Sequence, residues 1–457
     1  MSSSLAVDLY KEVTRPPRRK IKAVRVTIAQ PKSADDIAAI LIDLHKYPSP
    51  VRPMGSGSAV TRCAQTATGT LVDMSLLDRV LSMTTDTVTV QAGIRLRDLA
   101  EHLAKDNMEL ACSCTDPNRT VGGAISSSTL GGVLPGDVSQ LGSAACHITL
   151  INGLGRKVEV TEKLPDLLVL TRMSYGLLGI VYSVKLRIRP IRSYTMRTSK
   201  FKFDEFDRII PTLLQIQGAV KATLMPFRNR VFVELRYPDD EGKKSAALPW
   251  KLRDWATNKA LPTVVRSVEK IVPVKNIRDP LIDGFTEATH VLFNNRFSAS
   301  GSNAMEQSGR FKKLTVNPSA VSCTWFFSIK QIQTVLTAYQ QFCIGHYSNR
   351  NFRCDLPAEV WRIDKDQNSL LSPSFTGSVF ALKLCSTGQD GWDDYLLEFA
   401  EFAAHFQGIP VFNLTKGYKP GYAARVYGER LQRFRNIRHQ LDPKDRLLNQ
   451  FFAEHLK

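Results

Sequence analysis

The stretch Val51–Gly57 reads VRPMGSG, and Pro117–Ile125, about sixty residues later, reads PNRTVGGAI. Each stretch is a glycine-rich turn that follows an apolar run. Because glycine has no side chain, such turns leave backbone N–H groups open to a pyrophosphate or to a carbonyl at the edge of a ring. No G-x-G-x-x-G or G-K-[S/T] pattern follows a strand here, which excludes a Rossmann site and a P-loop. One such turn alone indicates a surface turn, whereas the pair favours a binding site.

Helical and alternating patterns surround the two turns. Ser33-Ala34-Asp35-Asp36 is typical of a capping box, and apolar residues at helical spacing follow it as far as Leu44. Further patterns predict a strand over 87–93, a helix over 95–105, a hairpin of 148–152 with 157–161, and a strand over 180–189. The break at Pro190-Ile191-Arg192 is the first expected domain boundary.

The next two hundred residues have a different, α+β texture. They predict helices over 204–217 and 393–406 and strands over 230–237, 322–328 and 378–385, with a polar insertion at 238–245. The segment 250–303 is basic, aromatic and poor in periodicity. It is interpreted either as a loop region that covers a substrate or as a long surface excursion.

Composition indicates a globular enzyme. The chain has 457 residues, of which 43% are hydrophobic and 23% charged, enough for two or three domains with a real core. Of the eight cysteines, Cys112 and Cys114 stand close together, but a C-x-C pair without a second pair or nearby histidines is poor zinc geometry. We therefore predict no metal site, reduced thiols and a cytoplasmic location.

Charge and hydropathy limit the partners. No apolar run reaches the roughly 18 to 20 residues of a membrane span, and residues 1–22 are basic without the apolar core of a secretory signal. The net charge of +18 is interpreted as a generally basic surface. It leaves a phosphorylated substrate or peripheral contact with a membrane open. No nucleic-acid partner is predicted, since the basic residues are dispersed and no DNA- or RNA-binding motif is present.

In order and spacing, the turns and their flanking elements resemble the FAD domain of the vanillyl-alcohol oxidase / p-cresol methylhydroxylase (PCMH-type) superfamily. A second signature, YGERLQRF at 427–434 and LDPKDRLLN at 441–449, is similar to the closing helix and loop of sugar-lactone oxidases, alditol oxidases and decaprenylphosphoryl-ribose oxidase. The resemblance implies an α+β fold. A basic tail (1–22) would precede a two-subdomain PCMH-type FAD-binding domain (23–193), a cap domain with an antiparallel sheet (194–412) and a segment that returns to the FAD domain (413–457).

The resemblance also implies where FAD binds. Diphosphate contacts are expected at Gly55, Ser56, Gly57 and Ser58. The turn along the flavin is expected at Thr120, Val121, Gly122, Gly123 and Ile125, and the adenine end at Gly179, Ile180 and Val181. Further contacts with FAD are expected at Pro53, Met54, Ala59, Pro117, Ser126, Asn413 and Asn449. Many relatives tether the flavin through a histidine, but here Ser58 stands at that position. Asn118 and Arg119 stand where a second, cysteine tether would lie. Non-covalent FAD is the consequence.

Flavin oxidation needs a substrate C–H over N5, a base for the hydroxyl proton and a positive group near the flavin pyrimidine. Lys416 resembles the lysine over the active site of related oxidases, with a solvated loop lysine as the alternative. Glu359-Val360-Trp361-Arg362 lies where sugar oxidases carry a Glu-x-Arg strand. Because of the extra residue, Glu359 and Arg362 would face opposite sides of a strand, so that only one reaches the site. A surface ion pair is the alternative.

Leu130 stands where relatives often carry a histidine, and leucine transfers no proton. Either Lys416 or His290 is therefore expected to take that role, or the chemistry differs from that of these relatives. His147, in an apolar stretch, is interpreted as a core histidine.

Together these features predict an FAD-dependent oxidoreductase that oxidises a hydroxyl of a sugar-like, polyol or sugar-lactone substrate, with an unspecified electron acceptor. A 2-hydroxyacid dehydrogenase is one alternative, although it normally uses carboxylate-binding arginines and a histidine cluster. A berberine-bridge-type oxidase would need the missing tethers. A flavin-binding protein without catalysis is the third alternative, given Leu130 and the altered Glu-x-Arg pattern.

Overall fold

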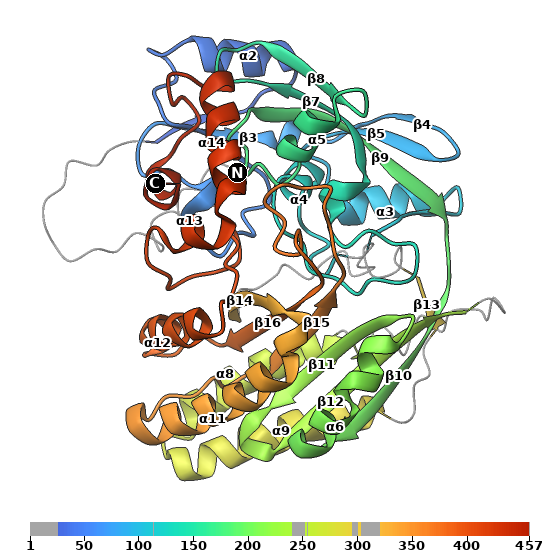
Figure 1. The fold of residues 1–457 in the computed structure, drawn as a ribbon, viewed down its shortest axis with the longest axis vertical. Helices are drawn as coiled ribbons and strands as arrows, with labels where there is room; N and C mark the ends of the chain where they lie inside the picture. The colour runs from blue at the N-terminus through green and yellow to red at the C-terminus, as the bar shows by residue number, and fades with distance from the viewer. Residues whose placement is uncertain are drawn as a thin grey trace, which may run out of the picture.

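The computed structural model describes residues 26–112, 114–239, 252–253, 255–294, 300–302 and 320–456. The basic tail 1–22 and most of the polar insertion 238–245 lie outside the described residues. The molecule has two halves, which lie one above the other in Figure 1. The glycine turns belong to the upper half.

The first part of the upper half is a small parallel sheet in the order β1-β3-β2. Its strands are β1 (Thr27–Ala29), β2 (Val51–Met54) and β3 (Thr70–Asp73). The predicted capping box is confirmed, since the Ser33 hydroxyl accepts from the Asp36 N–H and the Asp36 carboxylate accepts from the Ser33 N–H at the start of α2 (Ala34–Ile42). The sheet ends in the first glycine turn, which places that turn at the carboxyl end of β2.

The second part is an antiparallel sheet in the order β4-β5-β9-β7-β8, with β6 paired to β9. Its elements are β4 (Val80–Met83), β5 (Thr87–Gln91), α3 (Leu96–Ala104), β6 (Met108–Leu110), α4 (Val121–Ile125), β7 (Ala145–Ile151), β8 (Lys157–Thr161), α5 (Pro165–Thr171) and β9 (Ile180–Pro190). The predicted hairpin of β7 with β8 and the predicted strands β5 and β9 are confirmed. Their inward residues form one core with α2 and α4.

The lower half is a seven-stranded antiparallel sheet in the order β13-β10-β12-β11-β15-β16-β14. Its strands are β10 (Tyr194–Phe201), β11 (Ala219–Met225), β12 (Arg230–Pro238), β13 (Ser300–Gly301), β14 (Val321–Ser328), β15 (Ala358–Ile363) and β16 (Val379–Ser386). One face packs on α6 (Phe203–Gln215), α11 (Ile332–Arg350) and α12 (Trp392–His405) in the largest core cluster. The chain changes from one sheet to the other between Pro190 and Tyr194.

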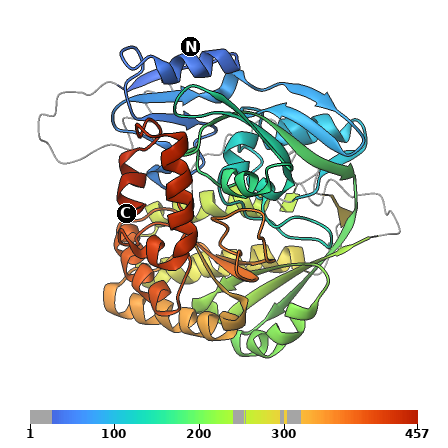
Figure 2. The same cartoon turned by 45° about the horizontal axis from the view of Figure 1, so that its top comes forward.

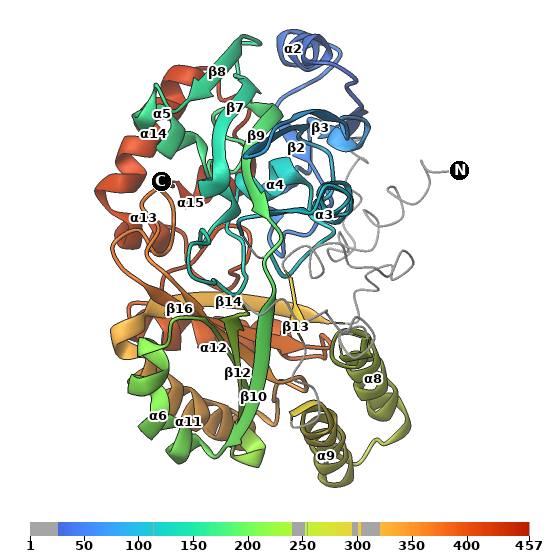
Figure 3. The same cartoon turned by 90° about the vertical axis from the view of Figure 1, so that its right-hand side faces the viewer.

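The segment 250–303 is not the irregular loop region that its pattern predicts. It forms the π-helical turn η5 (Ala256–Ala260), α8 (Leu261–Ile271) and α9 (Lys275–Asn294). Figure 3 shows α8 and α9 on the opposite side of the sheet from α6 and α11. The periodicity is hard to recognise because the outward side of α9 is the apolar one, as described below.

His147 is a second correction. It is not a core residue, since its side chain is 38% exposed and its Nε2 lies 2.5 Å from the Glu159 carboxylate on β8. The apolar neighbours of His147 point to the other face of β7, because side chains alternate along a strand.

The C-terminal segment contains α13 (Tyr422–Tyr427), α14 (Glu429–Leu441) and α15 (Gln450–His455), which lie beside both halves in Figures 1 and 2. Buried Arg446 fixes the segment to the upper half, because its guanidinium donates to the carbonyls of Ile40, Leu41 and Tyr47. Shorter 3-10 turns are η1 (Arg62–Ala64), η2 (Met74–Leu76), η3 (Leu141–Ala144), η4 (Pro226–Arg228) and η6 (Ile329–Gln331).

Candidate active site

A cavity in the upper half is lined by both glycine turns and by Asn413 from the C-terminal segment. Thirteen of the residues predicted to bind FAD line it: Pro53, Gly55, Ser56, Gly57, Ser58, Ala59, Thr120, Gly122, Gly123, Ser126, Gly179, Val181 and Asn413. The tertiary structure therefore brings together two turns, the start of β9 and a distant asparagine.

Six residues predicted to bind FAD do not line this cavity. Val121, Ile125 and Ile180 are buried in the core of the upper half, and the Pro117 carbonyl accepts the Arg97 N–H. Met54 ends β2. The Asn449 amide donates to the carbonyls of Arg62, Cys63 and Gln65, which fixes the loop behind the first turn.

Glycine is required at the cavity wall for two reasons. Gly57 has a φ of +71°, in the left-handed region that disfavours most side chains, and no atom lies within 4 Å of the position that a Cβ would take there. Gly122 has the opposite constraint, because a Cβ there would lie 2.8 Å from the Cβ of Ala92. The first glycine shapes an open turn, and the second allows α4 to approach its neighbour.

The second turn is held by a local cap. Thr120 precedes α4, and its hydroxyl accepts from the Gly123 N–H at 3.3 Å. A Cβ at Gly55 would collide with the same hydroxyl. The two glycine turns therefore meet at Thr120, and the cavity that they line lies next to this contact.

Two buried arginines at the cavity were not predicted to bind FAD. Arg52 is 1% exposed, and its guanidinium donates to the carbonyls of Cys63, Tyr175 and Leu447. Burial lowers its pKa to about 10. Arg119 is 8% exposed and donates to the Ser128 and Gly123 carbonyls at 2.8 and 3.1 Å. Both arginines lie within the two motifs, but their sequence context does not distinguish a buried arginine from a solvated one.

The remaining unpredicted lining residues are Cys63, Ala64, Met74, Ala92, Ser127, Tyr175 and Gly176. Most of them come from segments without a motif.

The donors and acceptors at this cavity fit FAD. The Asn413 amide donates to the Ser128 carbonyl at 3.0 Å, whereas its Oδ1 is buried and has no partner among the described residues. An orphaned buried acceptor at a cavity wall can accept an N–H from a bound molecule. The glycine turns and the two guanidinium groups match a diphosphate and the negative charge of a reduced flavin.

A charged cluster lies on the face of the seven-stranded sheet opposite α6 and α11. Glu359 on β15 pairs with Lys383 on β16 at 2.9 Å and with Lys221 on β11, and the Lys221 ammonium lies 4.6 Å from the centre of the Trp361 ring. Burial alone would raise the pKa of Glu359, but the two lysines hold it well below its usual range. Glu359 is therefore ionised across the physiological range.

The loop after the second glycine turn connects the cavity to this cluster. Leu130 packs with Trp361, and a Cβ at Gly132 would meet Ala219 Cβ at 2.9 Å. Trp361 and Glu359 are two residues apart on β15 and so share a face. The cluster and the cavity thus lie at the two ends of one loop.

Arg362 points to the other side of the sheet. Its guanidinium donates to the carbonyls of Leu214 and Ile216 at the end of α6 and pairs with Asp364. The structure therefore brings Glu359, and not Arg362, to the face that the loop 128–132 contacts. The alternation of side chains along β15 is the reason.

His290 of α9 joins the cluster electrostatically. Its ring stacks on Phe232 of β12 with the ring centres 5.1 Å apart, and its Nε2 has no partner among the described residues. Burial, together with Lys221 and Arg253, lowers its pKa to about 4. The imidazole is therefore neutral at physiological pH.

Lys416 lies beside β14, where its N–H contacts the Cys323 sulfur at 3.3 Å, and its side chain is exposed. It does not line the cavity, although Asn413 does. Cys323 opposes Leu384 on β16, next to Lys383. Cys323 and Leu384 belong to the core on the face covered by α6, α11 and α12, whereas Lys383 points to the opposite face, so these contacts do not place Lys416 in the cluster around Glu359.

Comparisons with known proteins agree with this geometry. The profile of an FAD binding domain matches residues 27–144, and the profile of D-arabinono-1,4-lactone oxidase matches residues 184–455, more than half of the chain. The chain belongs to the D-arabinono-1,4-lactone oxidase family. The resemblance to the PCMH-type flavoproteins and their sugar-lactone oxidases is thereby confirmed, together with the α+β fold.

Two curated relatives illustrate the family. The mitochondrial L-galactono-1,4-lactone dehydrogenase of Arabidopsis thaliana is 27% identical over 45% of this chain and 33% of its own length. The L-gulonolactone oxidase of Mus musculus is 23% identical over 93% of this chain and 94% of its own. The chain spans about a third to a half of the length of the first curated relatives it matches.

A solved structure supports the fold across the whole chain. The cholesterol oxidase of B. sterolicum superimposes with a TM-score of 0.74 at 15% identity, covering 97% of this chain and 99% of that one.

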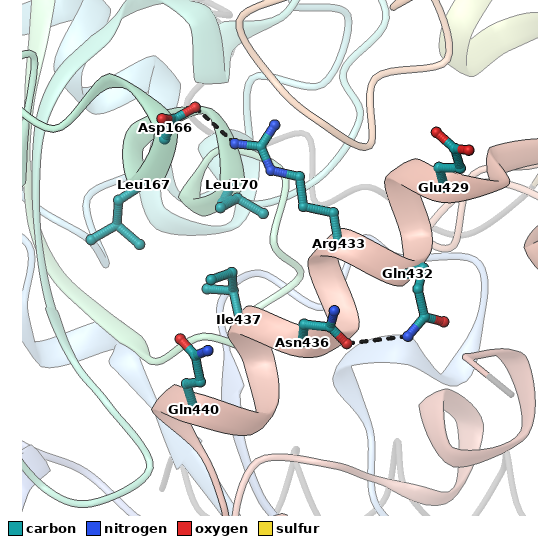
Figure 4. Close-up of a pocket in the computed structure, with 9 residues that line it drawn as sticks. All are labelled: Asp166, Leu167, Leu170, Glu429, Gln432, Arg433, Asn436, Ile437 and Gln440. Atoms are coloured by element: carbon teal, nitrogen blue, oxygen red, sulfur yellow. Dashed lines mark hydrogen bonds and ion pairs between the residues drawn. The ribbon is translucent and has the colours of Figure 1, made fainter.

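A second hollow lies between α5 and α14, away from both glycine turns (Figure 4). Its walls carry the exposed ion pair of Arg433 with Asp166, 2.7 Å apart. None of the predicted site residues lines it.

Metal ligands and membrane-spanning helices are both absent from the part of the chain that the structure describes. Its residues form no group of three or more histidine, cysteine, aspartate or glutamate side chains able to hold a metal ion. No helix among them is long and apolar enough to cross a bilayer.

Proposed function

We propose that this protein is an FAD-dependent oxidoreductase that oxidises a hydroxyl group of a sugar-like substrate, with a sugar lactone as the first candidate. The observation that carries the proposal is the glycine-walled cavity joined by the loop 128–132 to the charged face around Glu359. Bound FAD supplies the hydride acceptor. The relatives' lactone substrates and the family support the choice of substrate class.

Each polar group has a role that its environment permits. Glu359 is ionised and can accept a hydrogen bond from a substrate hydroxyl, but its depressed pKa makes it a poor base. His290 is neutral, so a ring nitrogen is free to accept the hydroxyl proton, but its pKa of about 4 makes it a weak base as well. Arg119 supplies positive charge at the cavity wall, and we assign a similar role to Lys416 from its resemblance to the lysine of related oxidases. Arg362, engaged on the other face of the sheet, has no role in this proposal.

We also propose that FAD is bound without a covalent link, because Ser58 lines the cavity where a tethering residue would lie. The purified protein should be yellow, and acid precipitation should release its flavin into the supernatant. Flavin that stays with the denatured pellet would refute the absence of a tether.

The test of the activity is anaerobic reduction of the bound flavin by a panel of sugar lactones, free sugars, polyols and 2-hydroxyacids. A lactone or sugar should bleach the flavin fastest. Reduction by a 2-hydroxyacid alone would favour the dehydrogenase alternative, and no reduction by any compound would favour a flavin-binding protein without catalysis.

A charge-neutral variant tests the charged face. Glu359→Gln keeps the shape but loses the charge that holds the substrate hydroxyl, so bleaching should slow by about ten- to a hundredfold while FAD is retained. Glu398→Gln is the matched control, because Glu398 pairs with Arg350 on the surface at 2.9 Å. Equal rates in both variants would remove Glu359 from the site.

The cellular setting and the electron acceptor are part of the proposal. The eight cysteines are free thiols, which supports a reducing compartment such as the cytoplasm. The net charge of +18 supports peripheral contact with an anionic membrane. Oxygen consumption, measured after the flavin has been reduced, distinguishes oxygen from another electron acceptor.

A further inference from the structure

The helix α9 is amphipathic in the reverse of the usual sense. Along one side of it, Ile277, Leu281, Phe285 and Leu292 are 58%, 51%, 41% and 57% exposed, and Ala288 between them is exposed as well. These five residues recur every three or four positions and share one face. We call them the apolar stripe; at 1.5 Å per residue it is about 22 Å long.

The opposite side of α9 is polar and is fully engaged with the protein. Asp279 accepts from the Tyr347 hydroxyl at 2.9 Å, and Asp283 accepts from Arg353 at 3.1 Å. Glu287 pairs with Lys200 and Arg228 at 2.7 and 2.9 Å.

These ion pairs, with the stack of His290 on Phe232, prevent α9 from turning its apolar side inward. Rotation would leave several half-buried or buried charges without partners, which costs far more than exposing the stripe. The exposure of the stripe is therefore a property of the fold and needs a separate explanation.

The stripe continues into neighbouring residues. Ile271 at the end of α8 is 76% exposed, Val274 in the turn to α9 is 51% exposed, and Trp255 before η5 is 44% exposed. More than half of the exposed large hydrophobic side chains in the described part of the chain lie between Leu252 and Leu292. Figure 3 shows α8 and α9 together at the side of the sheet, apart from the other helices.

The charge of this surface indicates what covers it. Among the described residues of 252–292, the exposed charged side chains are Lys259 and Lys270, and every acidic side chain is buried or half-buried. An apolar helix face in a segment whose exposed charged side chains are lysines, without exposed carboxylates, is complementary to an anionic lipid surface. Two copies of the face would bring lysines toward lysines, which disfavours self-association.

We propose that the apolar stripe of α9, with the α8–α9 turn, docks this protein onto the surface of an anionic bilayer. The helix lies in the interface with Ile277, Leu281, Phe285 and Leu292 among the acyl chains and the two lysines at the headgroups. Its inner side stays fixed to the cap domain through Asp283 and Glu287.

The experiment measures co-sedimentation of the full-length, FAD-loaded protein with vesicles. One set contains phosphatidylcholine alone, and a second contains phosphatidylcholine with phosphatidylserine. Wild type should bind the anionic vesicles, and added salt should weaken the binding. The double variant Leu281→Ser/Phe285→Ser should lower the partition coefficient at least about tenfold, because two of the inserting side chains are lost. Lys259→Gln/Lys270→Gln should reduce mainly the preference for phosphatidylserine.

The matched control is Leu81→Ser/Leu397→Ser, which removes two apolar side chains of similar exposure, 47% and 56%, from other surfaces. It should bind vesicles like wild type. All variants change exposed residues, so flavin absorbance and melting temperature should be unchanged, and reduction of the flavin by a sugar lactone in solution should proceed at the wild-type rate. Failure of vesicle binding is thus distinguishable from failure of the proposed activity.

Three results would overturn the proposal. Wild type could stay in the supernatant at every lipid concentration, or the control variant could lose as much binding as the stripe variant. Sedimentation velocity could also reveal a dimer that Leu281→Ser/Phe285→Ser converts to a monomer, in which case a second copy covers the stripe.

Discussion

At the scale of single residues, the cavity depends on a few positions whose backbone or contacts limit which residues fit. Gly57 adopts a left-handed φ and faces open space, Gly122 touches Ala92, and Asn413 carries an acceptor without a partner among the described residues. The close contact of Gly122 with Ala92 and this acceptor of Asn413 are typical of a binding site. A turn in solvent needs neither.

The first residue-scale prediction concerns Gly57. Gly57→Asp should give folded protein without FAD, since a carboxylate at this turn adds negative charge beside the expected diphosphate and like charges in close contact repel each other. Flavin absorbance after gel filtration measures occupancy. Gly57→Asn has the same shape, tolerates the left-handed backbone and lacks the charge, so it should retain much more FAD. Normal occupancy in Gly57→Asp would remove Gly57 from the diphosphate site.

The second concerns Lys416. A cation beside the flavin stabilises charge that develops as the hydride transfers, so Lys416→Ala should slow flavin bleaching by about a hundredfold to a thousandfold, roughly 3 to 4 kcal/mol. Because its side chain is exposed, we expect the melting temperature and the FAD content of the variant to be unchanged. Lys419→Ala, exposed three residues further on, is the control. Bleaching within about threefold of wild type would make Lys416 a solvated loop lysine.

At the scale of elements, α9 and β12 show how a buried titratable group couples to stability. His290 stacks on Phe232, and its pKa of about 4 lies below the ordinary value of 6.5 for a histidine. Between these pH values the unfolded chain binds the proton and the folded chain does not. The stabilisation is therefore complete above pH 6.5 and is lost as the pH falls through about 4.

Replacing His290 tests this coupling. The melting temperature of wild type should fall between pH 7.5 and pH 5 by more than that of His290→Gln, which cannot titrate. Because the pKa changes from 6.5 to about 4 on folding, the difference in unfolding free energy between pH 7.5 and pH 5 should be at most about 2 kcal/mol. His45→Gln, an exposed histidine, should follow wild type. Identical pH dependence of wild type and His290→Gln would mean that the imidazole is protonated in the folded protein.

At the scale of the whole molecule, the C-terminal segment joins the halves and closes the FAD cavity. Arg446 is 2% exposed and donates to carbonyls after and within α2, while Asn413 of the same segment lines the cavity and donates to the Ser128 carbonyl behind it. The chain returns over about four hundred residues to complete a site begun by the first glycine turn.

Arg446→Leu should therefore destabilise the protein by about 2 to 4 kcal/mol, because three buried carbonyls lose their donor. FAD should also be lost more readily, since the first turn follows the strand beside which Arg446 lies. Arg433→Leu is the control, because its ion pair with Asp166 in the surface hollow of Figure 4 is exposed and worth at most about 1 kcal/mol. Thermal unfolding with and without added FAD measures both effects. Equal melting temperatures for the two variants would contradict the role of Arg446.

Much of the upper half could be predicted because its signals are local. The capping box at Ser33, the alternation of β5 and β9 and the two glycine turns each involve residues a few positions apart. The same locality explains the error at 250–303. The polar side of α9 is stabilised by Tyr347, Arg353 and Lys200, which come from distant parts of the chain, so the segment lacks the inward apolar pattern that identifies a helix.

The amino-acid sequence by itself determined the family, the glycine turns, the serine at position 58 where many relatives carry a tethering histidine, and most elements with clean periodicity. Only the tertiary structure decided that Glu359 meets Lys221 and Lys383, that Arg362 faces away from them, and that α9 exposes its apolar side. The physical reason is that propensity, capping and hydrophobic period act between near neighbours, whereas the cost of burying a charge depends on partners that only the folded chain brings within reach.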